Sequence, residues 1–535
     1  MQSDTHGVLH ECRNVSRLAR CNQSANFLNL IVVEGHRDLL RRHTKYHTMV
    51  PARFSRLIRT GFVYNALMPR GAHEPAQTVR PIGQTFDVAA LLDRSSWSTY
   101  QKLLTVLAAL AVIFDGFDIQ ILGFALPSLI REWHVARGDF GPVLAVGLAG
   151  MAVGGPLAGY CGDRFGRRIA LIGCVVAFGL ATIATAMVHG FAGLTVLRFV
   201  TGMGTGGALP NASALTAEFA PLRRRATAVK LTLVCFPLGG MLGGLLAAWV
   251  LPKFGWRGLY AIGGVLPLLL AVVLWAILPE SPRFLARRPT LWPRLASLLA
   301  RMGHAVPAGA AFEDRGELEG AARASLRSLF SSRLARDTAG LWIAFFSSLG
   351  SVYLIFGWLP AMLTSQGLSL ATASTGLAVY NFGGVLGVLV WAMLVTLLGS
   401  RRPVLSGALA CAGSALALLV VPIQAHGDHV LLIACLGING LLANAVQTSM
   451  YALAAHVYPT SVRATGVAYA ATIGRLGGLL SSLFGAFVIQ AGAKTYWSVV
   501  AIAMVCAFAG LAWVRSHYPA IGRPETVLAG APATQ

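Results

Sequence analysis

The sequence predicts an all-α integral membrane protein with twelve transmembrane helices, arranged as two six-helix halves around a central cavity. Three observations predict this class. Hydrophobic residues make up 55% of the 535 residues, charged residues only 12%, and the mean hydropathy is +0.64. Runs of about 20 apolar residues, each long enough to cross a bilayer as a helix, recur along the chain. Lys and Arg gather in short clusters between these runs, as in cytoplasmic connections.

The composition excludes several other classes of protein. The net charge of +22 is spread over short connections and forms no basic stripe, so no nucleic-acid partner is expected. The eight cysteines form no C-x-x-C pair, which indicates neither a metal site nor a disulfide framework. The apolar runs hold no His/Glu metal cluster, and the chain has no nucleotide-binding loop or sizeable soluble domain. We therefore expect neither a membrane enzyme nor a sensor, and no cofactor.

Residues 1–85 stand outside the apolar pattern. They are rich in Lys, Arg and His and contain no run long enough to span a membrane. The segment lacks the form of a signal peptide, because its short apolar stretch ends at Glu34. Two interpretations stay open: a basic, disordered arm on the inner membrane face, or a start assigned too early, with the true start near Met49, Met68 or Val79.

The apolar runs predict the helices of each half. In the first half, residues 86–278, we expect spans at 103–128, 140–160, 169–188, 191–214, 226–251 and 258–278. In the second half, residues 339–516, we expect spans at 339–363, 375–397, 403–422, 429–452, 464–490 and 495–515. A cytoplasmic loop, 279–338, joins the halves, and a tail, 517–535, ends the chain.

Positive charge in the connections predicts the orientation in the membrane. Arg is abundant in 162–168, 221–230 and 279–338, whereas the opposite connections hold few basic residues. This bias places both termini and the long loop in the cytoplasm. We expect a multi-pass protein of the inner membrane that works as a monomer in the lipid bilayer.

Two acidic residues lie deep in the first predicted helix. Asp115 and Asp118 are separated by three positions, so both lie on one helical face near the middle of the membrane. A charge at this depth is costly, which makes an ionisable residue there a functional candidate. Two neighbouring carboxylates in a low dielectric favour holding a proton at neutral pH. The pair therefore predicts proton coupling.

Two arginines are also expected inside the membrane. For Arg198 in the fourth helix, two interpretations stay open: a functional residue that is a partner for Asp118 or a clamp for an anionic substrate, or a structural ion pair inside the first half. Arg475 lies at mid-depth in the eleventh helix, and no acidic residue lies deep in the second half. A planar guanidinium suits a substrate carboxylate, although backbone carbonyls are an alternative partner.

Further polar residues complete the candidate sites. Side chains that could orient a substrate are Tyr353, Trp358, Tyr380, Asn381, Asn439, Asn444 and Gln447, each of which could instead bond two helices together. At the cytoplasmic end of the second helix, a glycine turn with an acid and several arginines predicts salt bridges that hold one conformation and break in the other. These expected gating residues are Gly159, Asp163, Arg164, Gly166, Arg167 and Arg168.

These motifs carry a family likeness. Gly159–Arg168 resembles the G-x-x-x-D-R-x-G-R-R signature between helices 2 and 3 of the major facilitator superfamily. From about residue 86 to 515 the chain is similar to the aromatic acid:proton symporter family of that superfamily. The similarity is carried by Asp115–Asp118, Gly123, Pro127, Gly202–Asn211 (GMGTGGALPN), Glu218, Pro279–Phe284 (PESPRF) and Ala454–Gly478.

The resemblance implies a function and assigns roles to residues. The family imports aromatic carboxylates such as 4-hydroxybenzoate, protocatechuate or benzoate, together with protons, across the bacterial inner membrane. Its paired acids map onto Asp115 and Asp118, and its loop acid and arginine onto Asp163 and Arg164. By motif position, Arg198, Arg475 and the gating residue Glu218 carry over as well. The expected partners are therefore a small aromatic carboxylate and protons.

One motif departs from the family pattern, and other transported substrates stay possible. The second copy of the loop signature is reduced to Thr396–Arg402, without its acid and first arginine. A sugar porter of the same superfamily would also carry PESPRF, but paired acids and Arg475 argue against a sugar site. Another organic anion remains an alternative. Drug efflux is disfavoured, because Cys235–Gly244 lacks the Gly-Pro order of antiporters.

Overall fold

The residues described in the computed structural model belong to the unit Pro81–Gln535. The described residues are 85–93, 95–304, 306–307, 309–314, 329–331, 334–422, 429–459 and 462–519. The basic segment that precedes residue 85 lies outside them, and both interpretations of it stay predictions.

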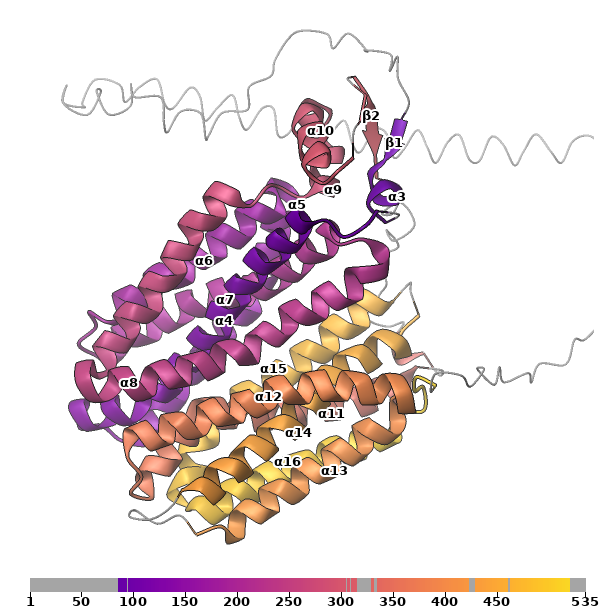
Figure 1. Cartoon of the computed structure of the whole chain (residues 1–535). Helices are drawn as coiled ribbons and strands as arrows, with labels where there is room; N and C mark the ends of the chain where they lie inside the picture. The colour runs from indigo at the N-terminus through magenta and orange to yellow at the C-terminus, as the bar shows by residue number, and fades with distance from the viewer. Residues whose placement is uncertain are drawn as a thin grey trace, which may run out of the picture. The chain divides into compact units, whose positions relative to one another are not determined.

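The first half consists of long helices drawn from indigo to magenta in Figure 1. They are α4 (Thr99–Trp133), α5 (Phe140–Phe165), α6 (Arg167–Thr185), α7 (Phe191–Phe219) and α8 (Leu222–Ile277), with a short 3-10 turn, η1 (Arg137–Asp139), before α5. Helix α8 contains two helices, because Gly255 adopts φ 64° and ψ −172° and breaks it. The expected loop at 252–257 is thus reduced to a kink, which glycine permits because it has no Cβ.

The second half forms the orange and yellow helices in Figure 1. They are α11 (Ala335–Ser365), α12 (Leu370–Leu398), α13 (Arg401–Val420), α14 (Val430–Val457), α15 (Arg463–Gln490) and α16 (Ala493–Trp513). Ten helices of the described chain are long and apolar enough to cross a membrane. With α8 taken as two helices and the more glycine- and threonine-rich α7 included, the described part has twelve long helices, so the twelve-helix prediction is confirmed.

Small residues allow the helices of the first half to pack closely. A Cβ on Gly154 of α5 would lie 2.0 Å from the carbonyl oxygen of Met203 on α7, and a Cβ on Gly202 would lie 2.1 Å from that of Gly147. Only glycine fits at such distances. The glycines of the GMGTGGALPN segment therefore bring α7 against α5, as membrane helices do in the absence of a hydrophobic driving force between them.

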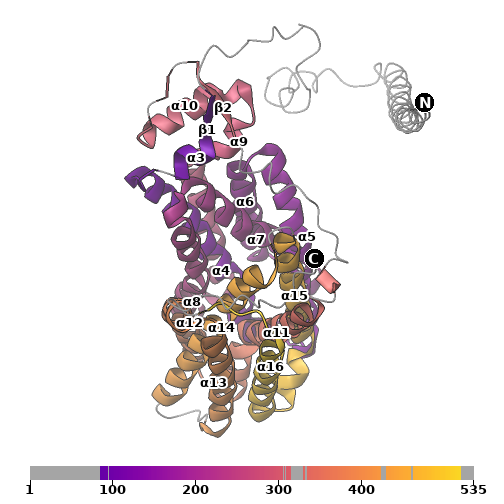
Figure 2. The same cartoon turned by 90° about the vertical axis from the view of Figure 1, so that its right-hand side faces the viewer.

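A small subdomain, here called the cap (residues 85–93, 282–304, 306–307 and 309–314), covers one end of the first half (Figures 1 and 2). It contains β1 (Thr85–Asp87), α3 (Val88–Asp93), α9 (Pro282–Ala286), η2 (Pro289–Leu291), α10 (Trp292–Arg301) and β2 (Ala311–Glu313). The two strands pair in parallel. Its apolar core is formed by Val88, Leu92, Leu295, Leu299 and Phe312. The cap thus ties the start of the first half to the loop that follows it.

The cap marks one end of the bundle, here called the cap end, and the opposite end is called the far end. Helices α4 and α8 begin at the cap end, and the connections α4–α5 and α6–α7 lie at the far end. Large apolar side chains face outward between the two ends, among them Val272, Trp275, Met393, Leu409 and Ile502. An exposed apolar surface of this kind is suited to lipid contact.

Candidate functional site

Helix α4 carries the two predicted carboxylates to the middle of the bundle. At 1.5 Å per residue, Asp115 lies about 24 Å and Asp118 about 28 Å along a helix about 51 Å long. Each residue is only 1% exposed. The two acids are therefore buried at mid-depth, as the sequence analysis expected, and solvent at either end of the bundle does not reach them in this conformation.

Asp118 has partners from two other helices of the first half. The hydroxyl of Thr182 on α6 donates a hydrogen bond of 2.5 Å to its Oδ1. Nη1 of Arg198 on α7 lies 3.8 Å from its Oδ2 and donates to its main-chain oxygen at 3.4 Å. Arg198 is itself only 5% exposed. Arg198 therefore pairs with Asp118 and compensates its charge inside the bundle, while a role of Arg198 in substrate binding stays a prediction.

Asp115 is placed differently from Asp118. No hydrogen-bond partner reaches its Oδ1 within the described chain. Its electrostatic neighbours include Arg475 on α15, in the other half. Nη1 of Arg475 lies 4.0 Å from the point that a Cβ on Gly155 of α5 would occupy. Arg475 therefore reaches across to the first half, and no carboxylate of the described chain lies within ion-pair distance of it.

A small cavity adjoins these groups between the two halves. Its volume is about 20 Å³, room for about one water molecule, whereas ligand pockets usually measure some hundreds of Å³. The lining residues are Asp118, Ile119, Leu144, Gly147, Leu148, Met151, Arg198, Gly202, Thr205, Tyr353, Phe356, Gly357 and Ser482. Both halves contribute, so movement of one half against the other would change its size.

Of the predicted substrate-orienting residues, Tyr353 lines this cavity, and its ring packs edge-on against Phe356 at 6.1 Å between centroids. The Phe356 ring packs in the same way against Tyr380. The hydroxyl of Tyr380 is buried without a hydrogen-bond partner in the described part of the chain. These three aromatic rings form one side of the central region, suited to contact with an apolar ring.

Other predicted residues bond helices to one another. Nε1 of Trp358 donates to the main-chain oxygen of Ser482 at 3.1 Å, which joins α11 to α15. Nδ2 of Asn439 donates to the hydroxyl of Ser414 at 2.8 Å, which joins α14 to α13. Asn444 donates to the main chain of its own helix, and Gln447 is half-buried on α14. None of the four lines the cavity, and their role in substrate binding stays a prediction.

Asn381 of α12 takes part in a contact between the halves that sequence reasoning missed. Its Nδ2 donates to Oε1 of Gln120 on α4 at 2.8 Å, and Nε2 of Gln120 donates back to its Oδ1 at 3.2 Å. Both side chains are fully buried. We call this contact the amide pair. Gln120 could have been flagged from the sequence, because it is a polar residue in an apolar helix only two positions after Asp118.

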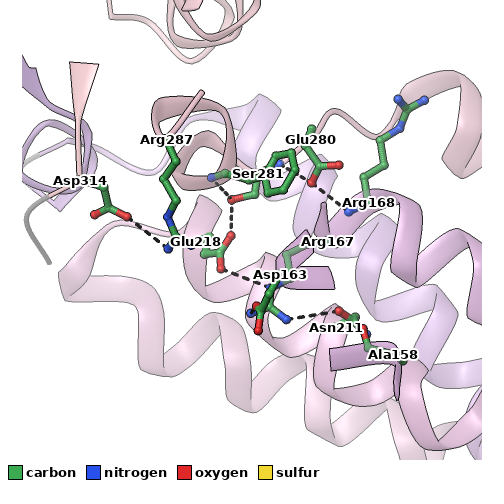
Figure 3. A network of polar contacts seen from close by, with 11 residues as sticks. Ala158, Asp163, Arg167, Arg168, Asn211, Glu218, Glu280, Ser281, Arg287 and Asp314 are labelled. Atoms are coloured by element: carbon green, nitrogen blue, oxygen red, sulfur yellow. Dashed lines mark hydrogen bonds and ion pairs between the residues drawn. The ribbon is translucent and has the colours of Figure 1, made fainter. Parts of the chain in front are cut away.

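The predicted gating residues form a network at the cap end (Figure 3). Asp163 lies 2.5 Å from Nη2 of Arg167, and Nε of Arg167 lies 3.8 Å from Oε1 of Glu218 on α7. The hydroxyl of Ser281, from the PESPRF segment, donates to Glu218. The end of α5, the start of α6, the end of α7 and the segment just before the cap are therefore held together by one set of polar contacts.

A second set of contacts in this network holds the turn between α5 and α6 in place. Gly166 has φ 112°, and a Cβ there would lie 2.1 Å from Oε2 of Glu280. Glu280 accepts from the main-chain N–H of Arg168 at 3.0 Å. Burial raises the pKa of Glu280, while its bonds to the N–H groups of Arg168 and Ser281 lower it. Glycine is required at 166 on both conformational and steric grounds.

The two remaining gating candidates contact less of the network. Arg164 lies beside the ring of Phe165, and its main-chain oxygen accepts from Arg288 at 2.5 Å. Gly159 faces open space: a Cβ there would meet nothing within 4 Å. The network of predicted gating residues is thus centred on Arg167, and the gating role of each residue stays a prediction.

The degraded motif of the second half is bound by the segment after α16. Ser400 exchanges hydrogen bonds with the main chain of Tyr518, at 3.1 and 2.8 Å. Asp337, at the start of α11, accepts from the N–H groups of Arg515 and Ser516 and from the Ser516 hydroxyl. Residues 514–518 therefore supply contacts at the cap end of this half, where the motif lacks its own acid.

The two halves contact each other between the level of Asp118 and the far end. A Cβ on Gly123 of α4 would lie 2.2 Å from the main-chain oxygen of Phe356, and one on Gly141 of α5 would lie 2.7 Å from that of Leu483. The amide pair lies in the same region of α4. The halves are thus in close contact on the far side of the paired acids.

Comparison with known sequences shows one family over most of the chain. The Major Facilitator Superfamily matches residues 108–377 and 341–533. The gallate transporter of Pseudomonas putida is 37% identical over 413 residues, covering 77% of this chain and 91% of that protein. The 4-hydroxybenzoate transporter PcaK of Acinetobacter baylyi is 33% identical over 426 residues, covering 79% and 92%.

Comparison with solved structures shows the same fold. The xylose transporter XylE from E. coli, in a partially occluded inward open conformation, superposes with a TM-score of 0.61 at 20% identity, covering 77% of this chain and 97% of that one. A D-xylose–proton symporter superposes with a TM-score of 0.60 at 19% identity, covering 78% and 99%. At such identities the similarity concerns the fold alone.

Proposed function

The chain belongs to the Major Facilitator Superfamily, and from this premise we propose that it imports an aromatic carboxylate together with protons across the inner membrane. It is a multi-pass membrane transporter whose curated relatives carry aromatic acids, among them gallate and 4-hydroxybenzoate. The observation that carries the proposal is the arrangement at mid-depth. Two buried acids lie at mid-depth on α4, and the electrostatic neighbours of one of them, Asp115, include Arg475 from the other half, which has no carboxylate within ion-pair distance among the described residues.

The two acids are proposed to differ in role. Asp118 is compensated by Arg198 and Thr182 within the first half, so it organises the site. Among the described residues, no hydrogen-bond donor reaches Oδ1 of Asp115, and the cation that stabilises its anionic form is Arg475, which forms no ion pair with it. A substrate carboxylate that binds Arg475 would remove this stabilisation, and Asp115 would then take up a proton. Substrate and proton would therefore bind together.

Proton coupling also offsets the energetic cost of importing an anion. An aromatic carboxylate carries one negative charge, and its entry into a negative-inside cell costs about 2.3 kcal/mol per 100 mV. One accompanying proton cancels this cost, and a second would drive accumulation. The rings of Tyr353 and Phe356 beside the cavity supply the apolar contact that an aromatic substrate needs.

Alternating access follows from the placement of the contacts. The cavity is too small for an aromatic acid, so a substrate must bind when the halves part on one side. We propose that the amide pair and the close glycine contacts close the far side, which faces the periplasm, and that the Arg167 network acts at the cytoplasmic side. The basic connections at the cap end support cytoplasmic termini.

Uptake into cells tests the proposal. Radiolabelled gallate, 4-hydroxybenzoate, protocatechuate and benzoate are supplied to cells that express the full chain, with and without a protonophore. Accumulation of one or more of them that the protonophore abolishes is the expected result. If none accumulates while the protein is found in the membrane, the proposal of aromatic acid uptake is wrong, and uptake of labelled organic anions and sugars is measured next.

A further inference from the structure

A basic cleft lies at the cap end of the first half, away from the central site. Its volume is about 530 Å³. The cleft lies where the chain enters α4 and where α7 passes into α8, and its lining residues are Ser95, Ser96, Trp97, Lys102, Pro221, Arg223 and Arg224. We propose that this cleft binds the phosphate headgroup of an anionic membrane lipid.

The charge of the cleft is the first argument. Lys102, Arg223 and Arg224 are exposed, and no carboxylate lies within ion-pair distance of them in the described part of the chain. The adjacent Arg225 is different, because it is paired with Asp93 and donates to the main chain of Ala217. Three uncompensated cations in one cleft attract an anion.

The backbone and Trp97 add to this attraction. Helix α4 begins at Thr99 and α8 at Leu222, so two helix N-termini, each with a partial positive charge, adjoin the cleft. Nε1 of Trp97 is buried and has no acceptor among the described residues. An indole N–H is a donor only, so a phosphate oxygen would satisfy it.

The surface beside the cleft favours a lipid over a free phosphate ion. Leu103 and Val106, which follow Lys102 on α4, are 46% and 50% exposed. On α8, Leu222 and Leu231 are 58% and 46% exposed. The basic cleft is thus continuous with an apolar surface on the two helices that border it, which matches a molecule with an anionic head and acyl chains. Trp is also enriched at the membrane–water interface.

The leaflet in which this lipid lies depends on the proposed orientation of the transporter, but the binding itself does not. With the cap end in the cytoplasm, the lipid belongs to the cytoplasmic leaflet. Basic pockets on that side of a membrane protein are suited to anionic headgroups, and each basic residue near the surface contributes about 1 kcal/mol.

Lipid binding by the purified full-length protein tests the proposal. Native mass spectrometry of the detergent-solubilised protein, titrated with phosphatidylglycerol or phosphatidylcholine, measures the affinity for each lipid. We expect a preference for phosphatidylglycerol that R223Q/R224Q weakens about 30-fold, which corresponds to about 2 kcal/mol. The matched control R294Q/R402Q removes two exposed arginines elsewhere at the cap end and should change this affinity less than threefold.

Three results would overturn the proposal: no preference for the anionic lipid, an equal loss in both double variants, or displacement of the lipid by glycerol phosphate at equal concentration, which would indicate a site for free phosphate. The melting temperature without lipid is measured for each variant as a check on folding. If R223Q/R224Q does not fold, K102Q with W97F serves in its place, and an unchanged lipid affinity in that variant contradicts the assignment. These experiments measure lipid binding and not uptake, so a failure of the lipid proposal can be told apart from a failure of the proposed transport function.

Discussion

Breaking the amide pair should open the far side of the transporter. Asn381→Ala removes both hydrogen bonds to Gln120 and leaves its amide buried without its partner across the halves. A net hydrogen bond contributes about 1 kcal/mol, and an unsatisfied buried polar group costs about 1–3 kcal/mol. When the halves part, water satisfies the amide. The closed far side should therefore lose about 2–3 kcal/mol, which shifts the conformational equilibrium roughly 30- to 150-fold.

Distances between spin labels at the far end measure this shift. Labels on cysteines introduced at His189, before α7, and Lys494, in α16, report the separation of the two halves once the native cysteines are replaced. The variant should gain a population with a longer distance. Asn439→Ala is the matched control, since Asn439 is an equally buried amide whose hydrogen-bond partners among the described residues lie within the second half.

The result for Asn439→Ala distinguishes a specific effect on the contact between the halves from a general loss of helix packing. The same gain of long distances in both variants, or none in Asn381→Ala, would refute the reasoning. A further check uses the chemistry of the pair: because Gln120→Ala removes the amide that Asn381→Ala leaves buried and unsatisfied, the double variant should show a smaller shift than Asn381→Ala alone.

Three further predictions follow from the central site and the gate. Asp118→Asn removes a buried ion-pair partner and should lower the free energy of unfolding by about 3–5 kcal/mol, whereas Asp115→Asn should lower it far less. Both variants should nevertheless abolish accumulation of substrate. Thermal unfolding measures the first effect, and uptake into cells measures the second. Arg475→Lys loses the planar fork and should weaken substrate affinity about tenfold or more, measured as apparent KM; an unchanged KM would disprove the carboxylate contact. Gly166→Ala should destabilise the protein by about 1–3 kcal/mol in thermal unfolding, and Gly159→Ala, with open space around it, by less than 1 kcal/mol; equal effects would contradict the strained-turn account.

Hydropathy was sufficient to predict the helices, because lipid demands long apolar runs. It could not locate their ends. The first helix was expected at 103–128 but runs from Thr99 to Trp133, since polar residues continue a helix beyond the bilayer core. The break in α8 was expected as a loop of several residues, but Gly255 alone makes it. The cap went unpredicted because its strands are only three residues long.

The sequence also predicted the charged residues of the central site, but not which of them lie next to one another. Depth alone singled out Asp115 and Asp118, and the pairing of Arg198 with Asp118 was among the open interpretations. Which acid faces Arg475 depends on how two halves, separated by hundreds of residues, lie against each other. The hydrogen bonds of Trp358 and Asn439 within the second half depend on how each helix is rotated about its axis, which hydropathy does not report.

Proton movement driven by substrate in proteoliposomes tests the central claim most directly. Purified protein is reconstituted with a pH-sensitive dye inside the vesicles, and an inward gradient of the aromatic acid that accumulates in cells is imposed without a membrane potential. The account predicts acidification of the interior that depends on the substrate and is absent with Asp115→Asn. Substrate entry measured in the same vesicles without any acidification would contradict it.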